Sequence, residues 1–70
     1  MNKIMTRSQL KIYKYIKLFI LLNGYSPTIR EIGKGVGLSS TATVQQHLCN
    51  LKERGYINFK KDKARTITIK

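Results

Sequence analysis

The sequence predicts an α+β fold in which three helices are followed by a two-stranded β-hairpin. Three observations predict it: two capping boxes that mark helix starts, a pair of glycines four residues apart that ends the second helix, and alternating apolar and polar side chains over residues 56–70. Three helices and then a hairpin are the element order of a winged helix-turn-helix domain, in which the hairpin is the wing.

Length, charge and cysteine content limit what the chain can be. Its 70 residues suffice for one domain, so we expect residues 1–70 to form a single unit. Fourteen Lys and Arg against three acidic residues give a net charge of +11, which favours a polyanionic partner. The apolar run Leu18–Leu22 is too short to span a bilayer, so we expect no membrane partner. Cys49 is the single cysteine, and no Cys/His spacing suits zinc, so we expect neither a disulfide nor a metal.

The first helix is predicted between Thr6 and the Asn23-Gly24 pair. Thr6 followed by Gln9 is the pattern of a capping box, and Asn-Gly is a helix stop. The side chains that recur at helical spacing, and so predict its buried stripe, are Ile12, Tyr13, Ile16, Phe19 and Ile20.

The second helix is predicted over Ile29–Val36, because Thr28 and Glu31 form another capping box. Within it, Gly33 is expected to let the next helix approach closely. Gly37 is expected to supply the left-handed conformation that turns the chain sharply after the helix. This glycine pair is the pattern of a helix-turn-helix.

The third helix and the wing complete the predicted fold. Ser40 is the expected N-cap of a helix that runs to about Arg54, with Val44, Leu48 and Leu51 facing the core. The two strands are predicted at Tyr56–Lys60 and Arg65–Lys70, joined by a basic tip at Lys61–Ala64. The apolar side chains expected on their buried face are Ile57, Phe59, Ile67 and Ile69.

Much of the chain resembles a known family. The stretches that carry the resemblance are Tyr25–Gly33, Val36–Leu38 and Ser40–Leu48, and they are similar to the N-terminal DNA-binding domain of LexA repressors from Gram-positive bacteria. The resemblance runs from about Met5 to Ile69 and implies a winged helix-turn-helix that binds double-stranded DNA. LexA repressors continue into a self-cleaving domain with a Ser/Lys dyad. This chain ends at Lys70, so we expect a stand-alone domain that does not cleave itself.

The base-reading residues are expected on the third helix, whose first half would lie in a major groove. By spacing alone, Ala42, Gln45, Gln46 and Cys49 share the face opposite the core. The positions that the LexA resemblance implies as base contacts are Ser40, Ala42, Thr43, Gln45 and Gln46. Glutamine amides can pair with adenine, hydroxyl groups with several bases, and methyl groups with thymine. The alternative is that the glutamines are merely solvated surface.

Phosphate contacts are expected from the wing and from the start of the second helix. The wing residues are Lys60, Lys61, Lys63 and Arg65, which the resemblance places along phosphates or in the minor groove. Their alternative role is a solvated charge run that protects an edge strand. Thr28 and Arg30 open the second helix, where free backbone amides suit a phosphate.

Leu18, Leu21 and Leu22 make the end of the first helix apolar nearly all round. The resemblance implies mostly polar residues at the positions of Phe19, Leu21 and Leu22. Two interpretations stand. The helix end pairs with a second copy or with a partner protein, or it belongs to a thicker monomer core covered by the Asn23–Ser26 loop or by strand residues.

The functional expectation is a cytoplasmic, nucleoid-associated DNA-binding regulator and not an enzyme, because His47 and Cys49 lack partners at catalytic spacing. We expect a LexA-like repressor of a prophage or mobile element, encoded by a bacterium or phage, with double-stranded DNA as its partner and no cofactor or small-molecule ligand. The alternative is a winged-helix adaptor that binds a protein or RNA through the same basic surface. An uncharged base-facing helix flanked by basic wing residues favours DNA.

Overall fold

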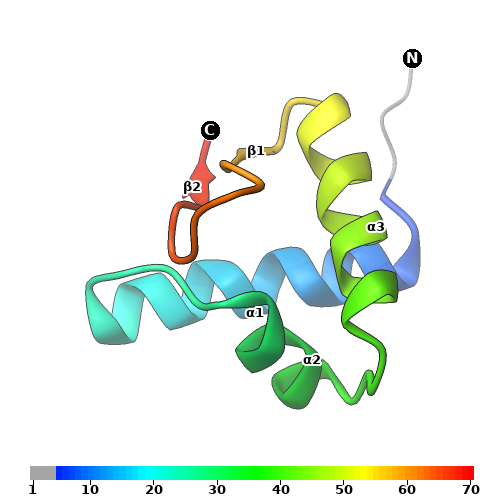
Figure 1. Cartoon of the computed structure of the whole chain (residues 1–70). Coiled ribbons are helices and arrows are strands. Elements are labelled where there is room, and N and C mark those ends of the chain that lie inside the picture. The colour runs from blue at the N-terminus through cyan, green and yellow to red at the C-terminus, as the bar shows by residue number, and fades with distance from the viewer. Residues whose placement is uncertain (1–4) are drawn as a thin grey trace.

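The computed structural model describes residues 5–70 and folds them as three helices followed by a short antiparallel hairpin (Figure 1). The elements are α1 (Arg7–Asn23), α2 (Ile29–Val36), α3 (Thr41–Glu53), β1 (Ile57–Asn58) and β2 (Thr68–Ile69). Each helix packs against the other two, and the hairpin contacts α3 through β1. The predicted winged helix-turn-helix fold is confirmed.

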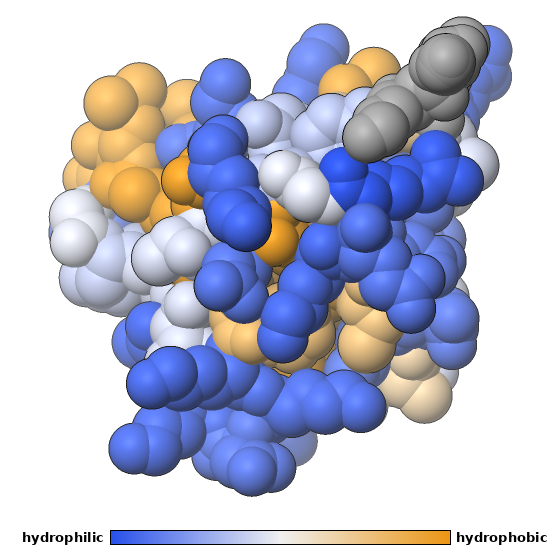
Figure 2. Space-filling view, turned by 90° about the horizontal axis from the view of Figure 1, so that it is seen from above, coloured by the Kyte–Doolittle hydropathy of each residue, from blue (hydrophilic) through white to orange (hydrophobic). Residues whose placement is uncertain are grey.

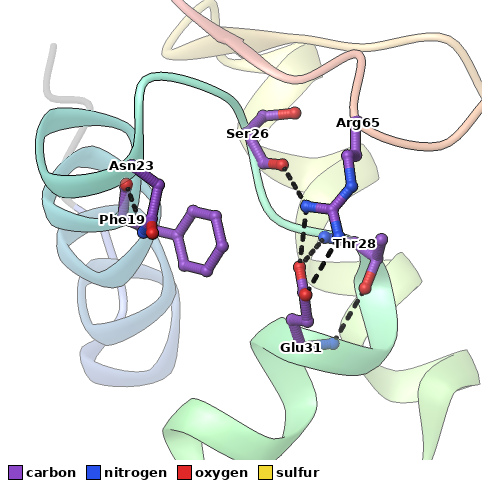
Figure 3. Close-up of polar contacts among 6 residues, drawn as sticks. All are labelled: Phe19, Asn23, Ser26, Thr28, Glu31 and Arg65. Carbon is purple, nitrogen blue, oxygen red and sulfur yellow. Dashed lines mark hydrogen bonds and ion pairs between the residues drawn. The ribbon is translucent and has the colours of Figure 1, made fainter.

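The helices begin and end where local signals predict. At the start of α1, the Thr6 side chain accepts a hydrogen bond from the Gln9 N–H, and the Gln9 side chain accepts one from the Thr6 N–H, each at 3.1 Å. At its end, Gly24 adopts the left-handed conformation with φ 81°. The Asn23 side chain also closes the last turn by donating to the Phe19 carbonyl oxygen at 2.9 Å (Figure 3). The capping box of α2 and the Ser40 N-cap of α3 are likewise formed.

The turn between α2 and α3 is tight, and both of its glycines have the expected roles. Gly33 also has a second role, within the turn itself. Gly37 is left-handed, with φ 80°. A Cβ atom on Gly33 would lie 2.8 Å from the carbonyl oxygen of Leu38 and 3.5 Å from Cγ2 of Val44. Gly33 therefore makes room first for the backbone of the turn itself and then for α3.

The core lies where the three helices meet, and the hairpin closes one side of it. Its buried apolar residues are Ile12, Ile16, Ile32, Val36, Val44, Leu48, Leu51, Ile57, Phe59 and Ile67. The predicted stripe of α1 is buried at Ile12 and Ile16, whereas Tyr13 and Ile20 lie at the core's edge. Phe19 instead packs its ring between those of Tyr15 and Tyr25, with centroids 6.0 and 5.8 Å apart, because it lies near the end of α1.

The predicted strand lengths are wrong. The sequence pattern predicted strands at Tyr56–Lys60 and Arg65–Lys70, but β1 and β2 pair only two residues each. Ile57 pairs with Ile69 in the observed register, so the two strands do present matching faces to the core. The remainder of the wing, between the two strands, is formed by turns rather than by a ladder.

Side-chain hydrogen bonds replace the ladder beyond the paired residues. The Phe59 N–H donates to Oδ1 of Asn58 at 2.9 Å, and the Lys60 N–H donates to Oγ1 of Thr66 at 2.8 Å. The Lys63 N–H closes a turn on the Lys60 carbonyl oxygen at 3.1 Å. These local bonds satisfy backbone N–H groups that a longer strand pair would otherwise satisfy. The strands therefore stop, although the alternation of apolar and polar residues continues in the sequence.

Candidate nucleic-acid interface

The first two turns of α3 present uncharged side chains to solvent. Ser40 caps the helix by accepting from the Thr43 N–H at 3.3 Å. The side chains of Ala42 and Gln46 are exposed, and Gln45 is half-buried. The structure therefore places all five predicted base-reading residues on or beside one accessible part of α3.

A groove of about 360 Å³ lies between the start of α2, the first half of α3 and the wing. It is lined by every predicted phosphate-binding residue together with one predicted base-reading residue: Thr28, Arg30, Gln45, Lys60, Lys61, Lys63 and Arg65. Two sets of residues that are far apart in sequence thus surround one concave surface. Gln46 and Ala42 lie outside the groove lining, on the neighbouring exposed part of the helix.

The groove walls carry concentrated positive charge. Arg30 is exposed on the α2 side, and Lys60, Lys61 and Lys63 are exposed on the wing side, with Asp62 the acidic residue among them. The backbone amides at the N-terminus of α2 add a positive potential to the same wall. This arrangement suits the phosphates of a nucleic-acid backbone beside α3.

Arg65 is bound within the protein, as Figure 3 shows. Its Nη1 donates to the Ser26 carbonyl oxygen and to Glu31 Oε1, and its Nη2 pairs with Glu31 Oε2, each at 3.0 Å. The guanidinium also lies 4.8 Å from the ring centroid of Tyr25. The hydrogen bond from Arg65, and then that from the Thr28 backbone, hold the pKa of the Glu31 carboxyl below its ordinary value. The charge of Arg65 is thus already paired within the protein. Its contact with phosphate stays a prediction.

Two residues that sequence reasoning did not assign to the wing hold it in place. Ser26 is buried, and its Oγ accepts from the Ile67 N–H at 3.2 Å. Lys52, in the last turn of α3, donates from Nζ to the Phe59 carbonyl oxygen at 3.1 Å. Neither role has a local signal in the sequence, because both partners belong to the wing.

His47 lies in α3, three residues after the fully buried Val44. Its side chain is half-buried. Its Nδ1 atom is buried and has no hydrogen-bond partner among residues 5–70. The side of the ring that carries Nδ1 is therefore turned away from solvent.

The end of α1 carries an apolar patch, which consists of Leu18, Leu21 and Leu22. These side chains are 54%, 79% and 72% exposed, and Figure 2 shows apolar groups gathered at this end of the molecule. The thicker monomer core is therefore wrong, because neither the following loop nor the strands cover these leucines. Pairing with another molecule stays a prediction.

None of the helices within residues 5–70 is long and apolar enough to cross a membrane. That same part of the chain contains no group of three His, Cys, Asp or Glu side chains placed to hold a metal ion.

Comparison with known proteins gives consistent matches. The family model of the LexA DNA binding domain matches residues 1–66. The chain is similar to the LexA repressor of Staphylococcus aureus (strain Mu3 / ATCC 700698), with 48% identity over 65 residues, which are 93% of this chain and 31% of that protein. The LexA repressor of Staphylococcus epidermidis gives the same identity over 65 residues, with 93% of this chain and 32% of the relative covered. The chain thus spans about a third of the length of these curated relatives.

Proposed function

The chain belongs to the LexA DNA binding domain family, and from that premise we propose that it is a sequence-specific regulator of transcription that binds double-stranded DNA as a LexA-like repressor. One observation carries the proposal beyond family membership. The uncharged, exposed face of α3 lies beside a groove whose two walls are basic. Such a division separates base reading from phosphate binding, as sequence-specific DNA recognition requires.

In the proposed complex, the first half of α3 enters the major groove, which is wide enough to admit a helix. Gln46 and Ala42 face the base edges there. Gln45 lies at the boundary, because it belongs to α3 and also lines the basic groove. Arg30 on one wall and Lys61 on the other bind the phosphates that flank the contacted bases.

Duplex RNA fits this arrangement less well than DNA. The major groove of A-form RNA is deep and narrow, so a helix such as α3 cannot reach its base edges. A purely electrostatic adaptor surface would also not need an uncharged helix face beside a groove with basic walls. The geometry therefore favours double-stranded DNA over RNA or an acidic protein surface.

The experiment that tests the proposal is selection of bound duplexes from a random pool, followed by affinity measurements on the selected site and on random duplex. Gln46→Ala should cost about 1–3 kcal/mol on the selected site and little on random DNA, because it removes a bidentate base contact. Lys61→Ala, the matched control, should weaken both duplexes alike. No consensus, or equal losses on both duplexes for Gln46→Ala, would contradict sequence-specific reading.

We also propose that two copies occupy one DNA site and pack against each other through the apolar patch of α1. A single helix-turn-helix domain reads only a few base pairs, and such domains usually gain specificity from a second copy one helical turn away. The net charge of +11 opposes pairing between free molecules, whereas DNA phosphates offset that repulsion. Pairing is therefore expected on DNA more than in free solution.

A further inference from the structure

The wing depends for its position on a small number of bonds to the rest of the molecule. Its strands pair over only two residues each, so the ladder alone leaves the tip weakly fixed. The ties to the α1–α2 loop and to α2 come from Arg65 and Ile67: Arg65 binds Glu31 and the Ser26 carbonyl oxygen, and the Ile67 N–H binds the Ser26 hydroxyl.

The backbone of Arg65 supports a specific positioning role. Its φ is 56°, the one positive φ of a non-glycine residue within residues 5–70. A non-glycine residue in the left-handed region is strained, and such strain persists where the surroundings hold the residue in place. The two hydrogen bonds to Glu31, the bond to Ser26 and the contact with the Tyr25 ring are the interactions that do so.

Glu31 binds both the N-terminus of α2 and the wing. Its Oε1 accepts from the Thr28 N–H at 2.9 Å, which caps α2, and from Arg65 at 3.0 Å, which holds the wing. One carboxylate therefore joins the N-terminus of α2 to the wing (Figure 3).

We propose that Glu31 and Arg65 form a positioning pair that sets the distance between α2 and the wing, and that this distance determines DNA affinity. Arg65 then acts through the placement of the lysines in the wing and not as a phosphate ligand. The inference rests on the proposed DNA-binding function and deepens it, because it identifies what fixes the groove that DNA enters.

The test uses a substitution for which net charge and wing position predict opposite changes in DNA affinity. Glu31→Gln keeps the capping box, since glutamine also serves at that position, but removes the ion pair and raises the net charge by one. If charge alone governs binding, or if the released Arg65 binds phosphate, the variant binds duplex DNA more tightly. The positioning pair predicts instead a weakening of about two- to fivefold, the effect expected for an ion pair of this exposure.

Two controls make the result specific. Glu53→Gln raises the charge by the same amount at the exposed end of α3, and it should bind DNA as tightly as the wild type or slightly more tightly. The double variant Glu31→Gln with Arg65→Lys should lose less affinity than the sum of the two single losses, because both changes disrupt the Arg65–Glu31 interaction. Additive losses, or tighter binding by Glu31→Gln, would overturn the proposal.

Binding is measured by fluorescence anisotropy on the pool-selected duplex, at a temperature where circular dichroism shows every variant folded. Amide hydrogen exchange at Ile67 gives a readout that needs no DNA, and it should be faster in Glu31→Gln than in Glu53→Gln. Failure of the wild type to bind duplex would refute the proposed function alone. Unchanged exchange at Ile67 would refute the positioning pair.

Discussion

Gly33 and Gly35 lie in the same short helix, yet alanine should have opposite effects at the two positions. Alanine is favoured over glycine by about 1 kcal/mol in a helix interior, and both substitutions gain that amount. At Gly35 the three atoms nearest to the added Cβ all belong to the outer part of the Tyr15 ring, and this half-buried side chain, unlike backbone, can turn away to relieve the overlap. Gly35→Ala should therefore be neutral or stabilising.

At Gly33 the obstacle is backbone. The new Cβ would lie 2.8 Å from the Leu38 carbonyl oxygen, and the Leu38 N–H is bonded to the Gly33 carbonyl oxygen at 2.8 Å, so the turn cannot shift without weakening its own hydrogen bond. Overpacking of this kind costs about 1–3 kcal/mol. After the propensity gain, Gly33→Ala should lose about 0–2 kcal/mol relative to the wild type, and about 1–3 kcal/mol relative to Gly35→Ala.

Urea denaturation followed by circular dichroism measures both variants, and thermal melting should separate them by about 4–8 °C per kcal/mol. DNA affinity should fall with Gly33→Ala, because opening the turn tilts α3 away from the groove walls, and should be retained by Gly35→Ala. A Gly33→Ala variant as stable as Gly35→Ala would refute the reasoning, since it would mean that the turn has room for a methyl group.

The remaining predictions concern salt, pH and association. If the interface neutralises about five phosphates, the logarithm of the binding constant should fall against that of salt concentration with a slope near −4 to −5, and Lys61→Ala should flatten it by about one; a slope near zero would exclude phosphate binding. Because the bond from Arg65 lowers the pKa of Glu31 from 4.5, the pair stabilises the folded state above that value and loses its effect as the pH falls through the lowered pKa. The stability difference between the wild type and Glu31→Gln, measured by urea denaturation, should thus be present near neutral pH and vanish well below 4.5; a pH-independent difference would contradict this. Leu18→Lys combined with Leu22→Lys should leave the exposed end of α1 folded and abolish cooperative binding to a duplex with two half-sites, as seen by sedimentation; a wild type that binds such a duplex only as a monomer would disprove pairing.

The helices were predictable because their signals are local. Thr6, Thr28 and Ser40 each cap a helix by bonding a backbone N–H three residues away, so the residues that specify each start are adjacent in the sequence. The turn after α2 was equally predictable, because the left-handed conformation that ends the helix depends only on the residue at position 37, a glycine. Helical periodicity also predicted that Ala42 and Gln46 of α3 are exposed, but Cys49, expected on the same face, is half-buried and packs against the core.

The wing was less predictable because its geometry depends on distant partners. Alternation of side chains indicates which face is buried, and Ile57 and Ile67 are buried as expected. It does not indicate where the ladder stops, since the Thr66 hydroxyl can replace a strand partner. The pairing of Arg65 with Glu31 could not be predicted. Arg65 is already explained as part of a basic wing and Glu31 as part of a capping box, so nothing in the sequence alone links the two residues.

The hydrogen bond between Ser26 and Ile67 also has a consequence for the order in which the molecule folds. It joins residues 41 positions apart, whereas the helix caps close within three residues. Closing a long loop costs more chain entropy than closing a short one, so the helices are expected to form early and the wing to dock late. The groove between α2 and the wing is therefore completed last, and a folding intermediate whose wing has not docked has α3 without the groove beside it.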